Sequence, residues 1–178
     1  TSSYNTVLGY GALSTEVTGG TATAIGTEAL GLQNQGDGDN TENTGVGYRA
    51  GYNNVTGKSN TYLGFLAGQG GTGSNTGNVG LGSNAMLAVT TGSYNTVMGT
   101  NAFKTSTNGH ENVIIGNDAG DDATDIGYGV IIGNGAGSGA LTNAADGSVF
   151  IGASAGAAVT SGANNLAVGY SAGAATTT

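Results

Sequence analysis

The apolar residues of this chain recur at a fixed phase. A large apolar residue is followed by Gly, then by two variable residues, and then by Ala, and this pattern occurs ten times. The ten glycines are Gly9, Gly26, Gly47, Gly64, Gly82, Gly99, Gly116, Gly133, Gly152 and Gly169. Successive glycines lie 17, 21, 17, 18, 17, 17, 17, 19 and 17 residues apart. A period this regular predicts a single repetitive architecture over residues 1–178, in which each copy is one structural unit.

Counting each copy from its Gly as position 0 shows a short strand before the glycine. Position −1 is always large and apolar, and position −3 is β-branched in nine of the ten copies, which favours a strand. Position −2 is apolar or Gly in every copy, so polar and apolar residues do not alternate. Such a strand is typically buried on both faces. We expect positions −3 and −1 to point into the coil, and position −2 to be covered by other copies of the chain.

The rest of each unit is polar and turn-like, and it holds all of the variation in length. The two longest connections contain the inserts Gln33–Asn40 and Ser138–Gly147. Position −4 is Asn in seven copies, so stacked units would align these side chains into an amide ladder: Asn5, Asn43, Asn60, Asn78, Asn95, Asn112 and Asn165. Together these patterns predict an all-β fold, a parallel β-solenoid (β-roll) of about ten 17-residue rungs.

Three copies carry a resemblance to known repeat families: Asn5–Leu13, Asn60–Gly68 and Asn95–Phe103. They resemble the "NTAxGxxAL" repeats of phage tail-fibre and tail-spike proteins. They are also similar to the head repeats of YadA-type trimeric adhesins, although the unit here is 17 residues rather than about 14. The resemblance covers essentially the whole chain. It implies an intertwined homotrimer of left-handed β-rolls that works in attachment, as shaft, spacer or receptor-binding surface, on a virion or outside a cell.

Charge and composition narrow the range of partners. The net charge is −8, and the only basic residues are Arg49, Lys58 and Lys104. Nucleic-acid binding needs a basic stripe, so this composition argues against a nucleic-acid partner. There is no Cys, and no apolar run approaches the ~20 residues of a membrane-spanning helix, so we expect no disulfide and no membrane insertion. We interpret the chain as a segment of a longer fibre protein.

Catalytic chemistry has few candidate groups in this sequence. His110 is the only His, and without Cys it cannot complete a zinc site or a nucleophilic triad, so we interpret it as a solvated loop residue. Turn acids gather at two places: Asp37 with Asp39, and Asp118 with Asp121, Asp122 and Asp125. We interpret them as solvated carboxylates, with calcium as the open alternative and no other cofactor or metal. A thin rod offers no cleft for paired carboxylates, so we predict a protein that is not an enzyme.

Ligand contact, where it occurs, is expected at the two inserts, Gln33–Asn40 and Ser138–Gly147, and at the exposed aromatic residues near the first. The candidate residues are Tyr48, Tyr52, Asn34, Asp37 and Asp39, with a host-surface glycan or protein receptor as the partner. Exposed aromatic rings suggest such contact, but the same rings could stack on neighbouring rungs or across the trimer. The two inserts are also expected to be dispensable loops whose removal leaves melting unchanged.

Two function classes therefore remain. The favoured one is a structural fibre or adhesin segment that forms a rigid trimeric shaft for attachment to a host or surface. The rival is a monomeric β-solenoid that binds glycan or ice through a regular row of Thr side chains at position −3. We disfavour the rival because this column is expected to face inward, and because Val79, Val113, Val130 and Val149 interrupt it.

Overall fold

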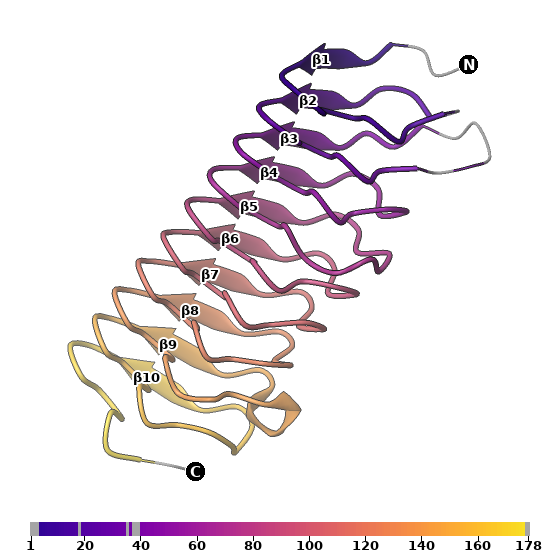
Figure 1. The fold of residues 1–178 in the computed structure, drawn as a ribbon. Coiled ribbons are helices and arrows are strands. Elements are labelled where there is room, and N and C mark those ends of the chain that lie inside the picture. The colour runs from indigo at the N-terminus through magenta and orange to yellow at the C-terminus, as the bar shows by residue number, and fades with distance from the viewer. Residues whose placement is uncertain (1–3, 18, 35, 37–39, 177–178) are drawn as a thin grey trace.

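The protein is a rod of stacked coils, each of which contributes one short strand to a common sheet (Figure 1). The computed structural model describes residues 4–17, 19–34, 36 and 40–176. The strands are β1 (Thr6–Leu8), β2 (Thr23–Ile25), β3 (Thr44–Val46), β4 (Thr61–Leu63), β5 (Val79–Leu81), β6 (Thr96–Met98), β7 (Val113–Ile115), β8 (Val130–Ile132), β9 (Val149–Ile151) and β10 (Leu166–Val168). One 3-10 turn, η1 (Asn143–Ala145), lies in the second insert.

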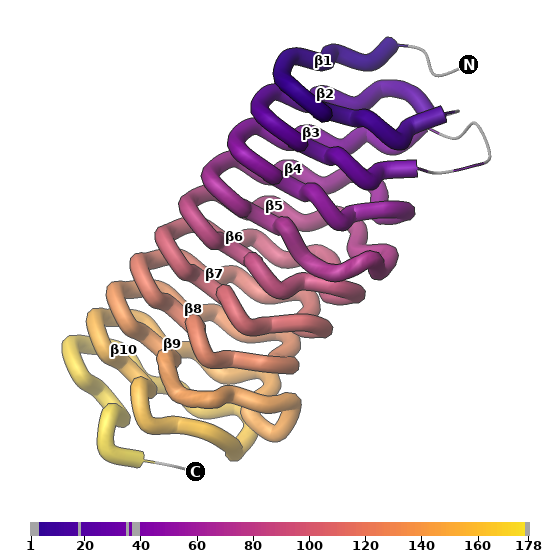
Figure 2. The backbone as a smooth tube through the Cα atoms, viewed as in Figure 1, coloured from indigo at the N-terminus to yellow at the C-terminus, as the bar shows by residue number. Residues whose placement is uncertain are grey.

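The ten strands form one parallel sheet in chain order, β1 to β10. Every pairing keeps the same register, so position −3 lies opposite −3, −2 opposite −2, and −1 opposite −1 along the whole rod. Each strand is reached from the previous one by a single turn of chain, and Figure 2 shows these turns stacked on one another along the rod. The prediction of an all-β parallel β-solenoid is confirmed.

The two faces of the sheet are the reverse of those expected from the sequence. Position −2 points into the coil: Val97, Ile114, Ile131 and Phe150 are fully buried by their own chain. Positions −3 and −1 point outward, and Met98 is 38% exposed. The expectation that position −2 is covered by other chains is therefore wrong. The lack of alternation indicated correctly that both faces are apolar, but alternation alone does not say which of them a coil encloses.

Large and small side chains at position −2 fit one another along the core. Tyr62 is fully buried, and its neighbours in the adjacent coils are Gly45 and Gly80. A Cβ on Gly80 would lie 3.0 Å from the Tyr62 ring, so a larger residue there would crowd it. The Tyr62 hydroxyl donates to Asn75 Oδ1 at 2.8 Å, and burial raises the pKa of this tyrosine. This size matching is the sequence signal that position −2 faces inward.

The glycine at position 0 is required twice over. Its φ lies between 126° and 141° in all ten copies, a region that side chains with a Cβ rarely adopt. In the first nine copies a Cβ would also collide with the carbonyl group of the corresponding glycine in the next coil. The Ala at position +3 then packs inside the coil, fully buried from Ala29 to Ala155. The invariant Gly and Ala are thus fixed by backbone angle and close packing.

The predicted asparagine ladder is present, and it is buried. Asn60 Nδ2 donates to Asn43 Oδ1 at 3.1 Å, and Asn112 Nδ2 donates to Asn95 Oδ1 at 2.9 Å. The same oxygens also accept from the backbone N–H of position −4 one coil further on, as in Asn95 N to Asn78 Oδ1 at 3.0 Å. The ladder therefore satisfies buried backbone donors as well as side chains, which supports its predicted role of holding the coils in register.

Both inserts contribute to the interior and are not independent loops. Gln33 is fully buried, and its side-chain amide donates to Thr41 Oγ1 and accepts from Asn43 Nδ2. In the second insert, Leu141 and Ala145 are fully buried members of the main hydrophobic core. The expectation that trimming the inserts leaves melting unchanged is therefore revised, since removing these residues would open the core.

Candidate interaction surface

The outer side of the sheet carries apolar and Thr side chains and no charged strand residue, and we call it the outer face. Its centre consists of positions −3 and −1 of the ten strands. No charged residue occupies either position in any copy. Position −1 includes Leu8 at 68%, Leu63 at 44% and Met98 at 38% exposure. Apolar strand positions that remain this open to water in one chain are unusual, because burial of such side chains is the main stabilising term in folding.

Seven aromatic residues lie in the two columns that flank this centre, and Glu42 and Glu111 occupy one of these columns in two other coils. Position −5 contributes Tyr4, Tyr94 and Tyr128, and position +1 contributes Tyr10, Tyr48, Phe65 and Tyr170. With these flanks, the outer face holds fifteen of the seventeen large apolar or aromatic side chains that are exposed in the described part of the chain. The other two are Val7 and Val17. Exposed apolar groups are thus concentrated on one side of the rod and are not scattered over it.

The outer face approaches the size of an interface. Nine inter-strand spacings of ~4.8 Å make it about 43 Å long, and the three residues from position −3 to position −1, at ~3.3 Å each, make its centre about 10 Å wide. The product, roughly 430 Å², is comparable to the largest apolar patch that a monomer ordinarily exposes. The flanking columns at positions −5 and +1 widen the face toward the ~800 Å² that each partner buries in a stable protein–protein interface.

Two predicted ligand-binding residues, Tyr48 and Tyr52, lie together around Arg49. The Arg49 guanidinium carbon lies 5.3 Å from the centroid of the Tyr48 ring and 5.0 Å from that of the Tyr52 ring. Arg49 also forms an ion pair with Glu28 in the preceding coil, and this hydrogen bond raises the pKa of Arg49. Tyr48 stacks on Phe65 of the next coil with 5.4 Å between ring centroids. The interpretation that these rings stack between rungs is confirmed for Tyr48.

Sequence reasoning left Arg49 out of the candidate site although it lies beside Tyr48 in the chain. The signal that could have found it is the register: residues 17 to 21 apart become neighbours, which places Glu28 beside Arg49. Of the other candidates, Asn34 is exposed, and its backbone N–H donates to the Val55 carbonyl at 2.9 Å. Asp37 and Asp39 lie outside the described residues.

The acidic turn near residue 120 is not arranged as a cation site. Partial burial and the neighbouring Asp122 raise the pKa of Asp121, while Lys104 opposes this shift. Asp121 Oδ1 has no hydrogen-bond partner among the described residues. Within those residues, no group of three or more His, Cys, Asp or Glu side chains could hold a metal ion.

His110 is half-buried and not fully solvated as expected. Its ring packs edge-on against Tyr128, with 5.2 Å between centroids. Position 110 also forms an isolated parallel bridge with Gly127 of the next coil. These contacts join two adjacent coils through the segments that lead into β7 and β8.

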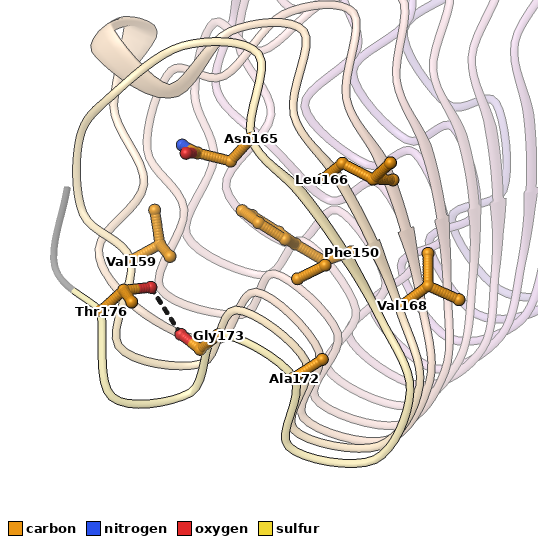
Figure 3. A pocket seen from close by; sticks show the side chains of 9 residues that line it. Phe150, Val159, Asn165, Leu166, Val168, Ala172, Gly173 and Thr176 are labelled. Atoms are coloured by element: carbon orange, nitrogen blue, oxygen red, sulfur yellow. Dashed lines mark hydrogen bonds between the residues drawn. The ribbon is translucent and has the colours of Figure 1, made fainter.

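A hollow of about 420 Å³ opens at the C-terminal end of the rod. Phe150 and Val159 line its inner part, and Leu166 and Val168 lie on the outer side of the coil (Figure 3). Ala167 also lines the hollow. No acidic or basic side chain lines it. It is therefore not a cleft with paired carboxylates. Its lining residues belong to the last two coils, so the hollow lies where no further described coil covers the interior.

Comparison with family models, curated proteins and solved structures found no match to this chain. In the described part of the chain, no helix is long and apolar enough to span a membrane. The functional argument therefore depends on the geometry of the rod and its outer face.

Proposed function

We propose that this chain is a structural segment of an extracellular or virion-surface fibre, in which three copies pack along their outer faces into a rigid shaft used for attachment to a host or surface. The observation that carries the proposal is the outer face, which carries no charge at positions −3 and −1 of ten coils and has seven aromatic residues along its flanks. Around a threefold axis, the columns at positions −3 and −1 of each chain are shielded from water by the other two chains.

The mechanism of such a segment is mechanical. Ten coils in one register give a rod whose length follows from the number of coils, and the buried Asn ladder holds that register. The number three comes from the resemblance to trimeric fibre and adhesin repeats. A partner is supported by the exposure of the outer face, which one chain leaves in water. No catalytic group is required for this role.

Adjacent residues of β8 provide a sharp test. Ile131 at position −2 is fully buried by its own chain, whereas Ile132 at position −1 lies on the outer face. We expect the wild-type chain to sediment at three times its 17.0 kDa mass. Ile132→Asp should dissociate the assembly and leave the β-sheet circular dichroism intact. Ile131→Asp should unfold the chain, since it buries an unpaired charge.

A matched control separates the interface from a general effect of charge. Asn108 is exposed in a turn away from the outer face, and Asn108→Asp adds the same charge there. This variant should keep the wild-type mass and melting temperature. A wild-type chain that sediments at 17.0 kDa over the whole concentration range would overturn the trimer.

A second candidate, a monomeric ice- or glycan-binding solenoid, gains one observation from the structure. Thr side chains at position −3 face outward, in an unbroken row over the first four coils: Thr6, Thr23, Thr44 and Thr61. The sequence analysis disfavoured this candidate because position −3 was expected to face inward. That argument no longer holds, since position −3 faces outward. Large aliphatic residues at position −1 share the same face, which favours burial against protein. Thermal hysteresis or glycan-array binding by a 17.0 kDa species would favour the second candidate.

A further inference from the structure

Two tyrosines and a glutamate form one column beside the strands in the middle of the rod. Tyr94, Glu111 and Tyr128 occupy position −5 of three successive coils, those of β6, β7 and β8. Their φ angles are nearly equal, at 60°, 56° and 57°, so the three side chains start from the same backbone conformation. The Glu111 backbone N–H donates to the Ser93 carbonyl at 3.0 Å. The Tyr128 backbone N–H donates to the His110 carbonyl at 3.1 Å, so the column is held in register.

Both tyrosine rings lean toward the preceding coil. A Cβ on Gly77 would lie 2.7 Å from Tyr94 Cδ1, so the Tyr94 ring lies against this glycine. The Tyr128 ring packs edge-on against His110, with 5.2 Å between the ring centroids. Because both rings are displaced in the same direction, two inter-strand spacings set their separation at about 10 Å. Glu111 belongs to the coil between them.

All three side chains are open to solvent. Tyr94 is 64% and Tyr128 is 58% exposed, and Glu111 is exposed as well. Within the described part of the chain, the Glu111 carboxylate forms no hydrogen bond or ion pair. Covering it in a lateral contact between copies would bury a charge without a partner, which is costly. We therefore expect this part of the flank to stay accessible when positions −3 and −1 are covered.

A similar set of side chains elsewhere in the rod holds a cation. The Arg49 guanidinium lies beside the Tyr48 and Tyr52 rings, and it also pairs with Glu28. The column at position −5 has the same kinds of group, two tyrosines and one glutamate, but no Lys or Arg stands among them. The faces of aromatic rings carry negative potential, and a carboxylate adds a full negative charge. A cation midway between rings ~10 Å apart would lie ~5 Å from each, within the ~6 Å reach of cation–π attraction.

We propose that Tyr94, Glu111 and Tyr128 bind an organic cation of the methylated-ammonium or guanidinium class. Such cations are weakly hydrated and give up water readily to aromatic rings, whereas a primary ammonium is more strongly hydrated. The chain's net charge of −8 raises the local concentration of cations around the rod. The site does not depend on the lateral assembly, because all three side chains belong to one chain.

Titration with two probes, choline and argininamide, tests the site and distinguishes the two classes of cation. Proton NMR of the probe reports binding, because a cation over the face of a ring has its resonances shifted upfield. At constant ionic strength, we expect saturable binding of at least one probe with a dissociation constant on the order of 1 mM. The neutral isostere of choline, 3,3-dimethyl-1-butanol, has the same shape without the charge, and it should bind at least about 10-fold more weakly than choline if choline is the probe that binds.

Variants of the column have a matched control in the same chain. Glu111→Gln and Tyr128→Leu should each weaken binding by about 3- to 10-fold. Glu42 is the control residue, since it is exposed, occupies position −5 and has a φ of 53°. Its neighbours at this position are Thr21 and Ser59, which are not aromatic. Glu42→Gln removes the same charge and should leave the affinity unchanged, and circular dichroism checks that each variant is folded.

Three results would overturn the proposal. The first is the absence of saturable binding by both probes, and titration with cellotetraose in parallel shows whether the rings bind sugar instead. The second is binding of choline and its neutral isostere with equal affinity, since the contact would then not depend on charge. The third is an equal loss of affinity in Glu111→Gln and Glu42→Gln, because the effect would then come from net charge and not from the column of Tyr94, Glu111 and Tyr128.

Discussion

Single side chains in this protein make many of their hydrogen bonds with the neighbouring coil of the same chain. Asn95 shows this most clearly, because it is buried and contacts both neighbouring coils. Its Nδ2 donates to Asn78 Oδ1 at 3.0 Å and to the Gly109 carbonyl at 2.7 Å. Its Oδ1 accepts from the Asn112 backbone N–H at 3.1 Å and from Asn112 Nδ2 at 2.9 Å. Replacing Asn95 therefore leaves polar groups without partners in both neighbouring coils.

We predict that Asn95→Ala destabilises the fold by about 2–4 kcal/mol, because buried donors and acceptors lose their partners at once. Urea unfolding followed by circular dichroism measures this cost. Asn108→Ala is the control, since Asn108 is exposed, and its cost should stay below about 0.5 kcal/mol. Equal costs for the two variants would contradict the ladder as the element that holds the coils together.

A pH effect is expected at Asp121. Burial and Asp122 raise its folded-state pKa above the ordinary value, so the folded chain binds this proton more tightly than the unfolded chain does. The group therefore favours folding at low pH, and this contribution is lost as the pH rises through the raised pKa. Asp121→Asn should raise the melting temperature slightly at pH 7, and the difference should disappear in acid. Asp122→Asn, at an exposed neighbour, serves as the comparison.

At the scale of the element, the coil is the unit of stability. Each strand pairs only with those of the preceding and following coils, so removing one complete coil preserves every type of contact. Deletion of Ser83–Gly99 joins Gly82 to Thr100 and keeps the motif intact. We predict a folded rod one coil shorter, with a sheet spectrum like that of wild type.

Deletion of residues 83–90 is the matched contrast. It removes part of a coil and shifts all later positions out of phase, so apolar side chains would point to water and Asn side chains to the core. This variant should fail to fold or should melt far below wild type. Similar melting of the two deletion variants would contradict the coil as the repeating unit.

The second insert provides an element-scale prediction of its own. Leu141 is fully buried in the main core although it lies in a connection that the sequence marks as a loop. Leu141→Ala should cost about 2–4 kcal/mol through lost burial and the cavity left behind. Thr142→Ala, at an exposed neighbour whose side chain caps η1, should cost about 1 kcal/mol. Urea unfolding distinguishes the two.

The sequence predicted the strands and their register well, because the motif repeats at near-constant spacing and parallel stacking is the simplest way to satisfy it. The prediction of which face is enclosed, positions −3 and −1, was wrong. Positions −1 and −2 are both apolar, so period alone left the choice open. The enclosed face is revealed by complementary volumes, as in Gly45, Tyr62 and Gly80, and by the Asn column at position −4, which shares the parity of position −2. Arg49 was missed because its ion pair with Glu28 joins different coils, although Tyr48 and Tyr52 lie in its own coil.

At the scale of the whole molecule, charge and the apolar surface are separated. Each chain carries a net charge of −8, while positions −3 and −1 carry none. Copies that pack along the outer face repel one another through their like charges without forming interfacial ion pairs at the centre. Added salt screens such repulsion, since the Debye length falls from ~30 Å at 0.01 M to ~10 Å at 0.1 M.

We therefore predict that salt tightens the lateral assembly. Mass photometry at rising NaCl concentration should show the monomer fraction falling, with the larger part of the change below ~0.1 M, where screening changes most. An assembly held by ion pairs would show the opposite trend. The Ile132→Asp variant should remain dissociated throughout, because screening does not restore its lost apolar contact.

The direction of the backbone hydrogen bonds has a mechanical consequence. The bonds between coils run along the rod axis, whereas the covalent chain winds around it. Tension along the axis therefore acts on a series of hydrogen-bonded junctions and not on the covalent chain. A single chain pulled from its ends should unwind one coil at a time, and each coil should release about 55 Å, the extended length of 17 residues less one inter-strand spacing. In the proposed trimer, lateral neighbours would bridge these junctions, so the same pull on an assembled shaft should meet a higher force before the first coil opens.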